Sequence, residues 1–127
     1  MTSRYQRTTA VIREQGYLYA KTEKWNHFAK IKTDLFNIFD LVVLKPFIGI
    51  VGVQVCGSDY KSHERKILVE ESKNTRAWLD SFGLIEIHAW AKRKKKRGGK
   101  AMVWVCRIFD IKVINGELKA IQRQKKK

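Results

Sequence analysis

Two polar residues lie where their side chains could bind a metal ion inside the protein. Asp40 is flanked by Phe39 and the run Leu41–Leu44, and Gln54 lies within the apolar run Phe47–Cys56. Both runs are typical of buried strands, where an unpaired polar group is unfavourable. Carboxylate and amide oxygens suit a hard cation such as Mg²⁺. The pair predicts metal chemistry, unless Asp40 caps a strand end and Gln54 is a hydrogen-bonded core amide.

Positive charge is concentrated in the last quarter of the chain. The net charge is +15; residues 91–127 carry 14 Lys or Arg against 2 acidic residues (+12), and residues 1–90 carry 13 against 10 (+3). Such segregation predicts a nucleic acid as partner, with an acidic membrane surface or acidic protein as the alternative. The basic residues expected to contact phosphates are Lys92, Arg93, Lys94, Lys95, Lys96, Arg97 and Lys100, followed by the tail 125–127.

Composition indicates one globular domain, expected over residues 1–115, with a basic C-terminal tail over 116–127. The chain has 127 residues, of which 44% are hydrophobic, enough to form a core without cross-links. Cys56 and Cys106 each lie in an apolar run, which predicts free thiols in a reducing compartment. Because the sequence lacks both a run of roughly 18 apolar residues and a secretion signal, a cytoplasmic location without membrane insertion is expected.

Local signals predict an α/β order of elements. The expected elements are a helix over 3–15 capped by Ser3 and ended by Gly16; a strand over 17–25; a loop over 26–33; strands over 35–44 and 47–56; a helix over 58–72 capped by Ser58; a helical piece from Asn74 to Gly83; and strands over 84–90 and 101–114. The basic run becomes the tip of a β-hairpin, and the chain after the turn Asn115-Gly116 is expected to fray.

With Asp40 opening the second strand and Gln54 near the end of the third, the chain resembles the PD-(D/E)XK nuclease superfamily, in particular its small phage-type and Holliday-junction-resolvase-like members. The resemblance covers about residues 3–110. It implies a restriction-endonuclease-like αβββαβ core, with a mixed central sheet flanked by helices. It also implies Mg²⁺- or Mn²⁺-dependent hydrolysis of DNA phosphodiester bonds, with branched or recombination DNA as substrate. Symmetric cleavage of such DNA would require a homodimer.

The resemblance also assigns roles to residues at the predicted site. Asp40 matches the motif's aspartate, Gln54 stands in place of its glutamate, and the main-chain oxygen of Val55 would complete the metal's ligands. Asp34 and Glu23 are the candidates to restore the missing carboxylate. Alternatively, Asp34 is part of a turn and Glu23 pairs with a neighbouring lysine.

Two positions depart from the family pattern. Phe39 occupies the place of the motif's proline, and Cys56 occupies the place of its lysine. The following helix offers Lys61, the preferred replacement, and Lys66. Ser58 could contact a substrate phosphate or simply cap this helix. Two rival interpretations follow: a catalytically degenerate member that binds nucleic acid without cutting it, and a small basic RNA-binding or assembly protein of unrelated fold.

Overall fold

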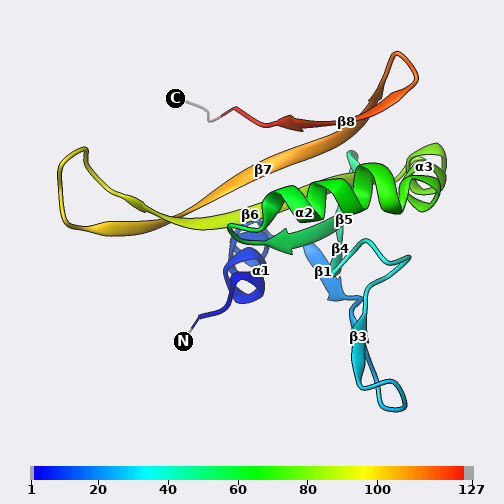
Figure 1. The fold of residues 1–127 in the computed structure, drawn as a ribbon, viewed down its shortest axis with the longest axis horizontal. Helices are drawn as coiled ribbons and strands as arrows, with labels where there is room; N and C mark the ends of the chain where they lie inside the picture. The colour runs from blue at the N-terminus through cyan, green and yellow to red at the C-terminus, as the bar shows by residue number, and fades with distance from the viewer. Residues whose placement is uncertain (1, 125–127) are drawn as a thin grey trace.

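The computed structural model describes residues 2–124. Over these residues the chain forms three α-helices and a mixed six-stranded sheet of order β1-β4-β5-β6-β7-β8, so the α/β class is confirmed (Figure 1). The elements are α1 (Arg4–Gln15), β1 (Leu18–Lys21), β2 (Lys24–Asn26), β3 (Ile31–Thr33), β4 (Leu41–Lys45), β5 (Gly49–Cys56), α2 (Tyr60–Arg65), the π-helical segment η1 (Lys66–Glu70), α3 (Ser72–Asp80), β6 (Leu84–Lys94), β7 (Met102–Ile114) and β8 (Glu117–Gln122).

Helix α1 begins and ends where the sequence predicts. The Ser3 hydroxyl accepts a hydrogen bond from the backbone N–H of Gln6, and the Gln6 side chain accepts one from the N–H of Ser3. This reciprocal arrangement satisfies two donors at the helix start. Gly16, with φ 82°, ends the helix in the left-handed conformation that glycine adopts readily. Ile12 then anchors α1 against β4 and β5.

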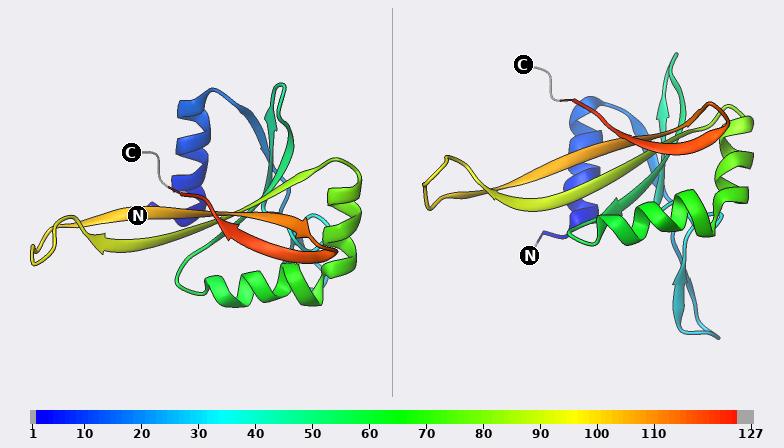
Figure 2. Two further views of the ribbon diagram at one scale, coloured as in Figure 1. Left: turned by 90° about the horizontal axis from the view of Figure 1, so that it is seen from above. Right: turned by 45° about the horizontal axis from the view of Figure 1, so that its top comes forward.

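The sheet is covered on both faces (Figure 2). Helix α1 packs through Ile12 on Leu41, Val43, Val51 and Val53. Segments α2, η1 and α3 cover the other face and form the crossover from β5 to the parallel strand β6. Strands β4 and β5 are interior strands of this sheet, with other elements packed on both faces. Burial on both faces accounts for their unbroken apolar character.

The close approach of Phe39 to Gly52 fixes the backbone just before Asp40. A Cβ atom on Gly52 would lie 2.5 Å from the Phe39 ring, closer than non-bonded carbons can come. Phe39 is fully buried, and its ring centroid lies 4.6 Å from that of Trp78 on α3. Glycine is therefore required at position 52, and the Phe39 side chain fastens the start of β4 to the sheet.

The prediction of one strand over residues 17–25 is wrong, since the chain forms β1 and β2 in separate sheets. The division falls at Thr22, whose N–H donates to the carbonyl oxygen of Asp40 and whose hydroxyl donates to that of Phe39. The expected loop over 26–33 contains β3, which pairs with β2 in a hairpin.

The expected strand over 35–44 begins only at Leu41. Phe36 and Asn37 have φ values of 53° and 61°, which a strand cannot accommodate. The intervening residues form a turn in which the N–H of Leu35 donates to the oxygen of Phe39.

The predicted caps of the second and third helices are also wrong. Asp59, not Ser58, holds the position before α2. Asn74 lies inside α3, where its side-chain amide donates to the oxygen of Phe36 and to Glu71. The helix expected to continue to residue 72 widens into η1 after Arg65.

At the C-terminal end, β6 and β7 form the predicted hairpin, with Lys92, Arg93 and Lys94 on β6 and the rest of the basic run in its turn. The segment expected to fray after Asn115-Gly116 forms β8 against β7. The tail Lys125–Lys127 lies outside the described residues. Cys56 and Cys106 are free thiols, as predicted. Among the described residues, no helix is long and apolar enough to span a membrane.

Candidate metal and nucleic-acid site

Three carboxylates meet at the point where β4 begins. Oxygen atoms of Glu23, Asp34 and Asp40 all lie within 4.8 Å of one another. Glu23 lies between β1 and β2, Asp34 follows β3, and Asp40 precedes β4. The candidates predicted to restore a missing carboxylate are thus brought together with Asp40, and three negative groups so close repel one another unless a cation or proton lies between them.

Backbone hydrogen bonds hold this arrangement. The N–H of Thr22 donates to the carbonyl oxygen of Asp40 over 2.9 Å, and that of Glu23 donates to the same oxygen over 3.3 Å. The N–H of Asp40 in turn donates to the oxygen of Val53 on β5 over 2.9 Å. The cluster is therefore fastened to the central sheet through its main chain, independently of the carboxylates themselves.

The structure also brings Asp40 and Gln54 into contact. The Asp40 Oδ2 atom accepts from the Gln54 Nε2 atom over 2.9 Å and from the backbone N–H of Val55 over 2.8 Å. Gln54 is only 2% exposed, and its Oε1 atom has no hydrogen-bond partner among the described residues. A buried amide oxygen without a donor is unfavourable, whereas it is a suitable ligand for a hard cation. The carbonyl oxygen of Val55 remains a predicted ligand.

The surroundings of Asp40 change its acidity. Burial, reinforced by the negative charges of Asp34 and Glu23, raises the pKa of Asp40 to about 7, although the hydrogen bond from Val55 opposes the change. Without a cation, the cluster therefore holds a proton at mildly acidic pH. Binding of a divalent ion would replace that proton.

The three carboxylates and Gln54 line a cavity of about 640 Å³, here called the acidic cavity. The lining also includes three cationic residues, Arg4, Lys21 and Lys32. The remaining lining residues are Ser3, Tyr5, Gln6, Val55, Cys56, Asp59 and His63. The cavity therefore brings cationic side chains next to the carboxylates.

The structure favours Lys66 over Lys61 as the lysine of this site. Neither lysine lines the acidic cavity, so their ion-pair partners distinguish them. The exposed Lys61 ammonium lies 3.5 Å from Glu64, which is outside the carboxylate cluster. The Lys66 Nζ atom lies 3.3 Å from Asp34 Oδ2 and donates to it. Lys66 is the first residue of η1. Cys56 cannot supply the positive charge of the family's lysine, and burial raises the pKa of its thiol to about 12.

A second cavity of about 550 Å³, here called the hairpin cavity, lies at the base of the basic hairpin. It is lined by Arg4, Gly57, Ser58, Trp90, Ala91, Lys92, Arg93 and Trp104. Arg4 lines both cavities, so the two adjoin. Ser58 belongs to the hairpin cavity and not to the acidic one. The exposed residues Lys92–Arg97 extend from it along the hairpin that projects from the body in Figures 1 and 2.

The tryptophans beside the basic run anchor the hairpin. The buried Trp90 indole donates to the Thr8 hydroxyl on α1 over 2.8 Å. The Trp104 ring lies 4.2 Å from the Arg7 guanidinium carbon and 5.6 Å from the Lys92 ammonium. Trp90 thus joins the hairpin to α1 by a hydrogen bond, and Trp104 contacts both Arg7 of α1 and Lys92 of the hairpin.

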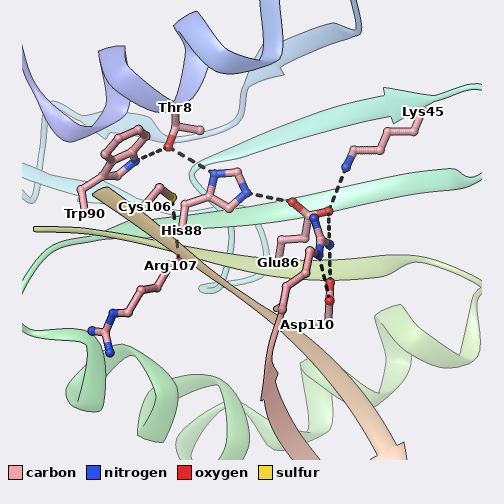
Figure 3. A network of polar contacts seen from close by, with 9 residues as sticks. Thr8, Lys45, Glu86, His88, Trp90, Cys106, Arg107 and Asp110 are labelled. Atoms are coloured by element: carbon pink, nitrogen blue, oxygen red, sulfur yellow. Dashed lines mark hydrogen bonds and ion pairs between the residues drawn. The ribbon is translucent and has the colours of Figure 1, made fainter. Parts of the chain in front are cut away.

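A separate buried network joins α1 to the sheet (Figure 3). His88 Nδ1 lies 3.3 Å from the Thr8 hydroxyl, and its Nε2 lies 2.8 Å from Glu86 Oε1. Glu86 Oε2 accepts from Lys45 over 2.9 Å and from Arg123 over 3.1 Å. Burial alone would raise the pKa of Glu86, but His88 and Lys45 outweigh it and hold that pKa well below its usual range.

This network does not form a hydrolase site, although hydroxyl, imidazole and carboxylate occur in the order that nucleophilic catalysis uses. Thr8 is fully buried, and its hydroxyl already accepts from Trp90. The adjoining cavity of about 30 Å³ has room for little more than a water molecule. His88 is buried, because α1 covers the face of β6 that carries it.

Sequence reasoning missed Arg4 and the network around Glu86. Arg4 lies in an unremarkable first helical turn, and only the fold brings it between the two cavities. For the network there was a signal, since Glu86 and His88 alternate with apolar residues on a strand with few polar neighbours. Lys45 and Arg123 are far from these residues in sequence, so their pairing with Glu86 could not be predicted from the sequence.

Comparisons with known proteins give no relative for this chain: no family model matches it, and searches of curated proteins and of solved structures found no significant match.

Proposed function

We propose that this protein is a metal-dependent endonuclease that hydrolyses phosphodiester bonds in DNA, with branched or recombination DNA as the substrate. The observation that carries the proposal is the unpartnered Gln54 oxygen beside three converging carboxylates. The adjoining basic surface supports a polyanionic substrate.

The residues present fit a Mg²⁺ or Mn²⁺ ion. Glu23, Asp34 and Asp40 would provide carboxylate oxygens, and Gln54 would provide its amide oxygen. A bound divalent ion polarises a phosphate and lowers the pKa of its bound water. The chain's own residues hold the site in place: Val55 orients Asp40, and Phe39 fixes the backbone before it.

The order of elements supports a restriction-endonuclease-like fold. Helix α1, strands β1, β4 and β5, the α2–η1–α3 crossover and strand β6 follow one another as in an αβββαβ core. The pair β2–β3 is then an insertion between the first two core strands. Asp40 precedes the second of these strands and Gln54 lies on the third, which are the positions of the superfamily's acidic motif residues.

The cations would divide into two roles. Lys66, held 3.3 Å from Asp34, is positioned to stabilise the negative charge that develops on the phosphorane. Arg4 and Lys92–Lys94 would bind backbone phosphates along the two adjoining cavities. Such contacts orient DNA without reading its sequence.

Two further features belong to the proposal. Symmetric cleavage of branched DNA needs two sites, so we expect a homodimer under cleavage conditions, which sedimentation equilibrium with and without DNA would detect. The free thiols Cys56 and Cys106 support a reducing, cytoplasmic location.

The test is cleavage of labelled plasmid, linear duplex, single strand and four-way junction with Mg²⁺ or Mn²⁺. Wild type, Asp40→Ala and a control, Asp80→Asn at the exposed end of α3, are compared. We expect the wild type and the control to cut, and Asp40→Ala to bind DNA without cutting it. Cleavage by Asp40→Ala at the wild-type rate would refute the proposal.

The alternative function is a catalytically degenerate nucleic-acid-binding protein of the same fold. It is favoured by Gln54 in place of a carboxylate and by Cys56 in place of a lysine. Binding that survives EDTA and Asp40→Ala, with no cleavage by any of the three proteins, would support this alternative. An RNA duplex and an RNA single strand in the same panel distinguish an RNA-binding protein.

A further inference from the structure

A second projection, whose residues Glu23, Lys32 and Asp34 line the acidic cavity, leaves the body separately from the basic hairpin (Figure 1). It is the ribbon of residues 23–34, here called the β2–β3 arm, in which Lys24, Trp25 and Asn26 pair with Thr33, Lys32 and Ile31. The pair forms a sheet of its own. In Figures 1 and 2 the arm leaves the body in a different direction from the β6–β7 hairpin.

One face of the arm continues from the three carboxylates. Side chains alternate along a strand, and directly paired residues share a face. Trp25 therefore lies on the same face as its partner Lys32, together with Glu23 and Asp34 at the root of the arm. The Lys32 ammonium lies 3.4 Å from Glu23, and the His27 ring packs edge-on against Trp25 with a centroid distance of 6.4 Å. A ligand in the acidic cavity thus meets Trp25 next along this face.

The exposed side chains of the arm are mainly aromatic and cationic. Trp25 is 51% exposed, and Phe28 at the tip is fully exposed. Residues 24–33 contain Lys24, Lys30 and Lys32 and no acidic residue. Two open aromatic rings among cations suit a partner that offers both flat apolar faces and negative charge. Nucleic acid with unpaired bases combines the two, because bases stack on aromatic rings while phosphates meet the lysines.

We propose that the β2–β3 arm binds unpaired bases of a single strand whose adjacent phosphate lies in the acidic cavity. Trp25 stacks on the base next to that phosphate, and Phe28 contacts a base further along the strand. Lys24, Lys30 and Lys32 neutralise the intervening phosphates. In a paired duplex the bases stack on one another, so their flat faces are not accessible to Trp25 and Phe28. The arm therefore selects DNA whose strand is unpaired on the side of the cavity where the arm lies. The inference rests on the proposed function for the identity of the partner.

The test measures binding in Mg²⁺ by full-length protein carrying Asp40→Asn, which lacks a proposed ligand carboxylate, so that no cleavage interferes. Ligands are a single strand, a blunt duplex and a forked duplex, the first and third carrying 2-aminopurine in the unpaired part. Trp25→Ala, Phe28→Ala and their combination are compared with the control Phe47→Ala. Phe47 is also fully exposed, but it lies in the β4–β5 turn.

We expect Trp25→Ala to weaken single-strand and fork binding about tenfold, in line with the loss of one stacked base. Trp25→Ala should also abolish quenching of 2-aminopurine, while its affinity for the duplex stays within about twofold of the parent's. The control Phe47→Ala should bind every ligand within about twofold of the parent. Unchanged single-strand affinity in the double variant would overturn the inference while leaving the proposed function intact. Equal weakening for duplex and single strand would overturn the selectivity for unpaired bases. Failure of the parent to bind any nucleic acid would overturn both proposals.

Discussion

Replacing Asp40 with asparagine removes the negative charge at the centre of the acidic cluster while preserving its shape. The asparagine carbonyl oxygen can still accept from Gln54 and from the N–H of Val55, as Asp40 Oδ2 does. The substitution therefore isolates the cost of burying a negative charge at position 40 beside Asp34 and Glu23. We expect Asp40→Asn to stabilise the metal-free protein at neutral and alkaline pH.

The size of the effect follows from the acidity of Asp40. Burial and the neighbouring carboxylates raise its pKa from 3.8 to about 7. Below pH 3.8 the group is protonated in both folded and unfolded protein. Between pH 3.8 and pH 7, Asp40 is ionised in the unfolded chain but still protonated in the folded protein. The free energy of unfolding of the wild type therefore falls by about 1.4 kcal/mol per pH unit. Above pH 7 the ionised group destabilises the fold by about 4 kcal/mol relative to the protonated one.

Urea unfolding in EDTA at pH 5 and pH 8 measures the effect. The free energy of unfolding of Asp40→Asn minus that of wild type should increase by about 3 kcal/mol from pH 5 to pH 8. The exposed control Asp80→Asn should show no such increase. Saturating Mg²⁺ should narrow the difference at pH 8, because the ion binds the wild-type cluster more tightly. A difference that is the same at both pH values in EDTA would refute the argument that burial and neighbouring carboxylates disfavour ionised Asp40.

Three further predictions concern the lysines and the buried network. Lys66→Met should lower the cleavage rate at least tenfold, whereas Lys61→Met should leave it near wild type; equal effects would contradict the assignment of Lys66. Replacing Lys94–Lys96 with glutamine should make the slope of log affinity against log salt shallower by about 2.7 for duplex DNA, at roughly 0.9 per phosphate contact. An unchanged slope would place the DNA elsewhere. Thr8→Val should lower the free energy of unfolding by about 2–4 kcal/mol, because it leaves the Trp90 indole N–H and the His88 Nδ1 atom without a hydrogen-bond partner; in urea titrations, a loss below 1 kcal/mol would show that solvent reaches these groups.

The sequence by itself determined the parts of this protein that depend on local signals. Ser3 and Gly16 mark the ends of α1 because a capping hydroxyl and a left-handed residue satisfy the helix termini within a few residues. Two unalternating apolar runs joined by a short turn identified β4 and β5 as interior strands. Because those strands pair as a hairpin, the proximity of Asp40 and Gln54 followed as well.

Tertiary structure decided what depends on partners far away in the chain. The strand predicted over residues 17–25 divides at Thr22 because the backbone before β4 offers it hydrogen bonds. Lys66 reaches Asp34, 32 residues earlier in the chain, because the fold packs the helical crossover beside the turn that precedes β4. Neither feature is indicated by the neighbouring residues in the sequence, since each depends on the position of another segment.

The burial of charge shows the same division. Glu86 and His88 have the alternation of a strand with one exposed face, yet both are buried under α1 and paired with Thr8, Lys45 and Arg123. Local pattern specifies which residues share a face of a strand, but only the packing of a distant helix determines whether that face meets water. The sequence therefore determined the elements and the pair Asp40–Gln54, and the tertiary structure decided which charged groups surround them.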